Sequence, residues 1–107
     1  MTGANAAGIA LALASAVAAA QSPEPQFPPA QIKQGLQIFS QNCAPCHGAR
    51  MLDGQAAFDL RTFPPGQKGR FVVSLTKGKN QMPPFGDLFK SEEIDALWAY
   101  VIAGEKR

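Results

Sequence analysis

The sequence predicts an all-α domain of three to four helices. Apolar residues recur at helical spacing in three stretches, over 30–42, over 67–77 and from Ser91 onward. The segments between them carry the glycines and prolines typical of loops. No convincing pair of strands and no internal repeat is present, and a chain of 107 residues forms one domain at most.

The N-terminal part is expected to lie outside this domain. Residues 1–20 carry no charged side chain and end in an alanine-rich run before Gln21, which predicts a cleaved secretory signal peptide and a periplasmic protein. The alternative is an uncleaved anchor, for which the stretch is short and lacks flanking charge. Residues 21–29 contain four prolines and predict an extended leader. We therefore expect the folded domain over 30–107, with no membrane span after cleavage.

The first helix is expected over 30–42, where Ile32, Leu36 and Phe39 share one face. Gly35 lies four residues before Phe39, on the same side. A glycine inside a helix costs roughly 1 kcal/mol relative to alanine. Gly35 therefore indicates either close backbone packing against another helix or a tolerated flaw, and its spacing does not decide between them.

The second helix is expected over 67–77, with Gly78 as its C-terminal stop. The last helix has Ser91 as its predicted N-cap. The apolar positions of the two helices are Phe71, Val72 and Leu75 in the former and Ile94, Leu97, Trp98, Val101 and Ile102 in the latter. Residues 51–66 and 79–90 are expected to be loops, the first anchored by Phe58, Leu60 and Phe63.

The run Cys43-Ala44-Pro45-Cys46-His47 carries the chemistry. A Cys-x-x-Cys-His run is the attachment site of a c-type haem, in which the two thiols add across porphyrin vinyl groups as thioethers and the histidine lies under the iron. The other interpretations of this run fit the sequence less well. A structural zinc site needs four ligands, and His47 is the only histidine. A thioredoxin-like site needs a βαβ context. A disulfide that encloses two residues would stabilise the chain little.

The second axial position of the iron decides between two functions. An iron with both positions filled transfers electrons, whereas an open position allows ligand binding or catalysis. Met51 lies four residues after His47, so a continued helix would project it on the same side as His47. Met82 lies 35 residues after His47, beyond a loop and a helix, and the following prolines stiffen the chain beside it. We therefore expect Met82 to be the second metal ligand, and the alternative is that Met82 fills the core.

These motifs resemble those of the small bacterial class I cytochromes c. The matching segments, within 30–103, are Gly35-x-x-x-Phe39, Cys43-Ala44-Pro45-Cys46-His47-Gly48, Lys77-Gly78-Lys79-Asn80-Gln81-Met82-Pro83-Pro84-Phe85 and Leu97-Trp98-Ala99-Tyr100-Val101. The resemblance implies a compact cytochrome c fold around one covalent haem c bound by Cys43, Cys46, His47 and Met82. It also implies that the terminal helices cross where Gly35 and Phe39 meet residues 98–100.

One stretch departs from the common pattern of that family, residues 58–64. It leaves open which backbone carbonyl accepts the free N–H of His47, and whether Arg61 binds a haem propionate. Residues 57–64 and the Met82-Pro83-Pro84-Phe85 loop also resemble cytochromes that accept electrons from quinoprotein alcohol dehydrogenases, which makes such a dehydrogenase a candidate partner.

His/Met ligation favours reduced iron and fills both axial positions, which predicts an electron carrier and not an enzyme. The carrier would move single electrons between a dehydrogenase or other donor and a terminal oxidase or other acceptor. One alternative is a haem-binding subunit of a larger oxidoreductase. Another is a peroxidase-like or gas-sensing protein, which would need a distal acid–base group that no second histidine supplies.

The net charge of +2 is too small for a nucleic-acid binder, but its distribution is uneven. No acidic residue lies between Asp59 and Asp87, and acidic residues prevail from Asp87 onward. The basic residues inside that interval are Arg61, Lys68, Arg70, Lys77 and Lys79. This pattern predicts a dipolar monomer whose basic side meets an acidic docking patch on a redox partner. The alternative is ordinary solvated surface charge.

Overall fold

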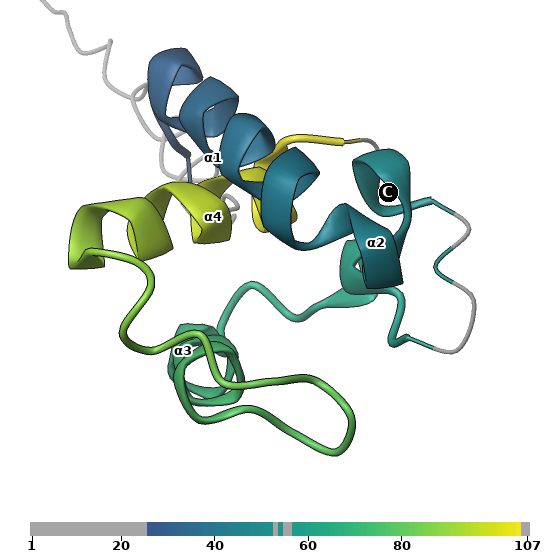
Figure 1. Ribbon diagram of the computed structural model, residues 1–107. Coiled ribbons are helices and arrows are strands. Elements are labelled where there is room, and N and C mark those ends of the chain that lie inside the picture. Colours follow the sequence, from purple (N-terminus) through teal and green to yellow (C-terminus); the bar gives the residue numbers. More distant parts are fainter. Residues whose placement is uncertain (1–25, 53, 55–56, 106–107) are drawn as a thin grey trace, which may run out of the picture.

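The computed structural model describes residues 26–52, 54 and 57–105. The elements are the helices α1 (Pro29–Asn42), α2 (Ala44–His47), α3 (Lys68–Lys77) and α4 (Ser91–Ala103), with the 3-10 turns η2 (Ala49–Met51) and η3 (Leu60–Thr62) (Figure 1). The described part of the chain contains no β-strand, so the predicted all-α fold is confirmed. The predicted signal peptide lies outside the described residues.

The start of α1 includes the last residue of the predicted leader, Pro29. Proline suits the first turn of a helix because its missing N–H would have no partner there. The carbonyl of Pro28 accepts hydrogen bonds from the backbone N–H groups of Gln31 at 3.0 Å and Ile32 at 3.2 Å. The last two prolines of the leader, Pro28 and Pro29, therefore form the start of α1.

Gly35 allows α1 and α4 to cross in backbone contact. A Cβ atom at Gly35 would overlap the carbonyl oxygen of Ala96 and would lie 2.7 Å from the Cβ of Tyr100. One turn further along α1, the ring of Phe39 lies against that of Tyr100, with 5.2 Å between centroids. Figure 1 shows the crossing of the two helices. Close packing is therefore the reason for Gly35, and the predicted crossing is confirmed.

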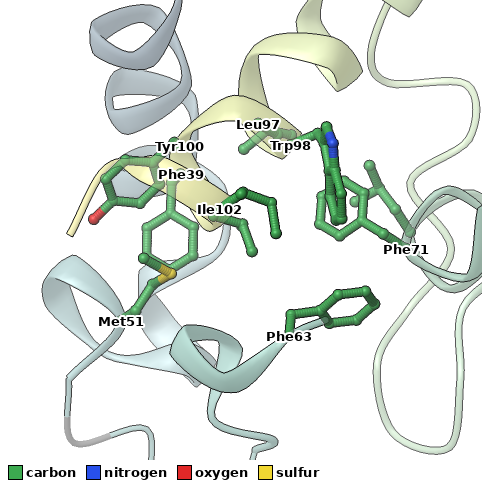
Figure 2. Close-up of a cluster of buried hydrophobic side chains, with 10 residues drawn as sticks. Phe39, Met51, Phe63, Phe71, Leu97, Trp98, Tyr100 and Ile102 are labelled. Carbon is green, nitrogen blue, oxygen red and sulfur yellow. The ribbon is translucent and has the colours of Figure 1, made fainter. Parts of the chain in front are cut away.

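The core gathers around α4, whose residues are buried without interruption from Ala96 to Ile102. Such a helix is apolar on more than one face because it packs on several sides. In Figure 2, Phe39 and Met51 lie on one side of the cluster, while Phe63 and Phe71 lie on the other. The second group is aromatic and makes edge contacts: the rings of Phe63 and Phe71 are 5.9 Å apart.

The start of α4 differs from the prediction, because Ser91 is the first helical residue and Lys90 is the N-cap. The carboxylate of Glu93 accepts a hydrogen bond from the backbone N–H of Lys90 at 2.8 Å. An acidic side chain that reaches back from the first turn thus replaces the expected serine cap. Such a carboxylate also interacts favourably with the positive end of the helix dipole.

The chain after His47 leaves the helical path, so the condition under which Met51 would project on the same side as His47 is not met. Arg50 and Met51 adopt positive φ angles of 57° and 64°. The guanidinium of Arg50 donates hydrogen bonds to the carboxylate of Glu105 at 2.9 and 3.2 Å. The hydroxyl of Tyr100 donates to the same carboxylate at 2.8 Å. These contacts tie the segment after the motif to the end of α4, while Met51 is buried in the core.

We predict that Gly35→Ala lowers the free energy of unfolding by about 2–3 kcal/mol, because the added methyl group forces α1 and α4 apart. Gly69→Ala is the matched control. Gly69 lies in α3, and nothing lies within 4 Å of a Cβ added there. This control should be neutral or stabilising by up to about 1 kcal/mol. Thermal unfolding of both holoproteins measures the difference, and equal effects would contradict the role assigned to Gly35.

Candidate haem-binding site

A cavity of about 1010 Å³ lies inside the helical domain. All four predicted site residues, Cys43, Cys46, His47 and Met82, contribute to its lining. The apolar part of the lining comes from the core and includes Phe39, Phe63, Phe71, Leu75, Leu97 and Val101. The fold therefore brings the cysteine motif and the distant methionine loop to the same space.

One helical turn holds the motif. Cys43 is the C-cap of α1 and donates its backbone N–H to the carbonyl of Phe39 at 2.8 Å. The carbonyl of Cys43 in turn accepts the backbone N–H of His47 at 2.9 Å. Cys43 and Cys46 are free thiols. Burial, and to a smaller degree the nearby Cys46, raises the pKa of the Cys43 thiol to about 11, so an unattached Cys43 is neutral at pH 7.

The ring of His47 is oriented by a backbone carbonyl. Its Nδ1 lies 3.3 Å from the carbonyl oxygen of Phe58. Because a carbonyl oxygen only accepts, this contact is a hydrogen bond when Nδ1 carries the proton, which leaves Nε2 with its lone pair. Burial lowers the pKa of His47, and the bond to Phe58 opposes that shift. The structure thus answers the question left open by the sequence: the carbonyl is that of Phe58.

A tight turn presents Met82. The backbone N–H of Lys79 donates to the carbonyl of Met82 at 3.1 Å, and the N–H of Met82 donates to the carbonyl of Lys79 at 2.9 Å. Asn80 takes φ 54° inside this turn, a conformation that asparagine tolerates better than most residues. The two reciprocal bonds restrict the backbone on both sides of the turn.

The C-terminal end of α3 anchors the chain directly after Pro83-Pro84. The carbonyl of Leu75 accepts the N–H of Phe85 at 2.8 Å, and the carbonyl of Thr76 accepts the N–H of Gly86 at 3.1 Å. These are carbonyls that a helix end leaves without an intrahelical partner. Gly78 ends α3 with φ 81°, and a Cβ there would lie 2.7 Å from the carbonyl oxygen of Met82. The predicted helix stop is confirmed, and it also makes room for the Met82 backbone.

The basic residues predicted to form one side of a dipole are partly neutralised. The ammonium of Lys68 lies 2.7 Å from the carboxylate of Asp95, which belongs to the acidic terminal helix. The guanidinium of Arg61 lies 3.1 Å from Asp59, and this pairing lowers the pKa of the Asp59 carboxyl group. The predicted separation of basic and acidic residues is therefore wrong for Lys68. Both pairs are exposed, so each contributes little to stability.

Three features of the site were not predicted from the sequence. The first is the Phe58 carbonyl, which lies in the stretch that departs from the family pattern. The second is the anchoring of residues 85–86 on α3. The third is Arg70, which lines the cavity although the sequence shows it only as one cation among several. Phe58 was expected to be an apolar anchor of its loop, yet the residue is 54% exposed.

Comparisons with known proteins agree with this geometry. The family model described as cytochrome C oxidase, cbb3-type, subunit III matches residues 30–101. The chain is 36% identical to a cytochrome c6 of a Nostoc species over 64% of this chain and 66% of that protein. It is 35% identical to cytochrome c6 of Microcystis aeruginosa over 64% of this chain and 91% of that protein. A quinohemoprotein alcohol dehydrogenase of Pseudomonas putida is 32% identical over 68% of this chain and 10% of its own length.

The residues present fit a covalent haem. Two free thiols and a histidine occupy one helical turn at the wall of a largely apolar cavity. The chain therefore belongs to the small monohaem class I c-type cytochromes. As a member of this family it contains one covalently bound haem c.

We predict that Gly78→Ala strains the Met82 turn, because a left-handed conformation costs a residue with a Cβ about 1–2 kcal/mol and the methyl group meets the Met82 carbonyl. Amide hydrogen exchange at Met82 and Phe85 should accelerate. The matched control is Gly66→Ala, since nothing lies within 4 Å of a Cβ added at Gly66. Unchanged exchange at Met82 in the Gly78 variant would contradict the proposed role of this glycine.

Proposed function

We propose that Cys43 and Cys46 form the two thioethers to the haem, and that His47 and Met82 are its axial ligands. The carrying observation is that these four residues line one cavity, although a loop and a helix separate Met82 from the motif. In each thioether the S–H group adds across a vinyl double bond, which requires no oxidant. The bound haem supplies one-electron chemistry through its iron.

The polypeptide, in this proposal, holds both ligands in place and excludes water. The hydrogen bond from Nδ1 of His47 to the Phe58 carbonyl fixes the ring and leaves the lone pair of Nε2 available, so Nε2 would be the atom that binds the iron. The turn from Lys79 to Met82 and the anchoring of Phe85 on α3 hold the thioether of Met82. Apolar walls keep water from the site, and a thioether ligand favours the reduced state.

The donor and acceptor are proposed from the comparisons. A segment similar to this chain forms part of a protein named a quinohemoprotein alcohol dehydrogenase, which supports a dehydrogenase of that kind as donor. The family description names a subunit of a cytochrome c oxidase, which supports a terminal oxidase as acceptor. We propose a monomeric carrier that moves single electrons between them.

The periplasm is the proposed location, on the basis of the apolar, uncharged residues 1–20. Among the helices of the described residues, none has both the length and the apolar character needed to cross a bilayer. Detection of the processed chain in a periplasmic extract tests the location, whereas a chain retained in the membrane fraction would favour an anchored form.

A second candidate function is a fixed haem subunit of a larger oxidoreductase. The oxidase subunit in the family description and the small share of the dehydrogenase that matches both favour it. Co-purification under native conditions separates the two candidates. A subunit stays with its complex at high salt, whereas a diffusing carrier is recovered alone.

We predict that Met82→Ala opens the second axial position. Carbon monoxide should bind quickly to the reduced protein, and the reduction potential should fall because the thioether is lost. Met51→Ala is the control, because Met51 is buried in the core and does not contribute to the cavity lining. It should cost about 2–5 kcal/mol of stability and leave ligand binding unchanged. The opposite pattern would exclude Met82 as the ligand.

We predict that electron transfer with the physiological partner slows as ionic strength rises, because Lys77 and Lys79 steer the protein toward an acidic patch. Screening acts over about 10 Å at 0.1 M salt. Lys79→Glu should lower the bimolecular rate constant, whereas the control Lys33→Glu on α1 should change it little. Stopped-flow kinetics over a salt series measures both, and a rate independent of salt would indicate apolar docking.

A further inference from the structure

The three arginines in the described part of the chain occupy different environments. Arg50 is bonded to Glu105 and Arg61 to Asp59. Arg70 forms no ion pair with an acidic residue of the described chain. Of the three, only Arg70 contributes to the cavity lining. Of the three arginines, the one at the cavity is therefore the one that forms no ion pair within the described residues.

An aromatic ring holds Arg70 in this position. Its guanidinium carbon lies 4.5 Å from the ring centroid of Phe63, a cation–π distance. Phe63 is buried and its ring meets that of Trp98 edge-on at 5.8 Å, so the ring is itself held by the core. Contact with the ring leaves guanidinium N–H groups available, and their fork geometry suits a carboxylate.

A c-type haem brings two carboxylates into this cavity as its propionates. The thioethers at Cys43 and Cys46 would involve the vinyl groups, so the propionates would remain available to side chains of the cavity walls. Those walls are largely apolar, and the charged side chains among the lining residues, His47 apart, are Arg70 and Lys79. A carboxylate in apolar surroundings needs a cation and hydrogen-bond donors.

We propose that Arg70, and not Arg61, binds a haem propionate and thereby positions the haem and raises its reduction potential. This inference rests on the proposed function, since it assumes that the haem occupies the cavity described above. Removal of a positive charge beside the haem favours the oxidised iron, so the potential should fall. A nearby arginine also keeps a carboxylate ionised, so the propionate should become harder to ionise without it.

The test uses the holoprotein with Arg70→Gln, Arg70→Lys, Arg61→Gln, Lys77→Gln and Lys79→Gln. Protein-film voltammetry gives the potential as a function of pH, and infrared titration gives the ionisation of the propionates. In Arg70→Gln we expect a lower potential and an acid dissociation constant of one propionate that falls about tenfold or more. Arg70→Lys should restore part of both, because it keeps the charge but not the fork.

The controls separate a direct contact from general loss of charge. Lys77→Gln removes a charge from the same helix, and Lys77 does not contribute to the cavity lining. This variant and Arg61→Gln should leave the propionate titration unchanged. A larger effect in Arg61→Gln or Lys79→Gln, or an equal effect in Lys77→Gln, would overturn the assignment to Arg70. Failure of the Met82 assignment would appear instead in the carbon monoxide test, which does not involve Arg70.

Discussion

The backbone contact between α1 and α4 at Gly35 positions the other elements of the domain. α1 leads directly into Cys43, so the placement of α1 on α4 also places the motif. α4 contributes Leu97 and Val101 to the cavity lining. A residue larger than glycine at the crossing would separate the motif from the wall that it faces, because backbone atoms of the two helices already touch.

The cavity and the hydrophobic core share residues such as Phe39, Phe63 and Phe71. A domain of this size buries a smaller share of its surface than a larger one, and a cavity in its core leaves side chains without contacts on one side. A large apolar cofactor supplies those contacts. Stability and cofactor binding are therefore coupled, and a substitution in the core is expected to affect both.

The role of each charged side chain depends on its neighbours. The carboxylate of Glu105 accepts hydrogen bonds from Arg50 and Tyr100 and holds the chain after the motif against α4. The exposed pair of Lys68 and Asp95 joins α3 to α4 and reduces the dipole that the linear order of charges suggests. Long-range steering depends on the summed charge distribution, so a lysine paired with an adjacent carboxylate contributes little to it.

The sequence alone determined those features that depend on residues close to one another along the chain. The contiguous Cys43–His47 motif predicted the haem, and apolar spacing predicted α1, α3 and α4 to within one residue at their starts, because helical periodicity and capping are local properties. The prediction of Ser91 as the N-cap was wrong, because the Glu93 side chain bonds the backbone N–H of Lys90 and makes Lys90 the N-cap. The tertiary structure alone decided that Gly35 meets Ala96, that Phe58 supplies the carbonyl for His47, and that Arg61 and Arg70 lie in different surroundings. These contacts join segments distant in the sequence, and their partners depend on the path of the backbone, which no local pattern records.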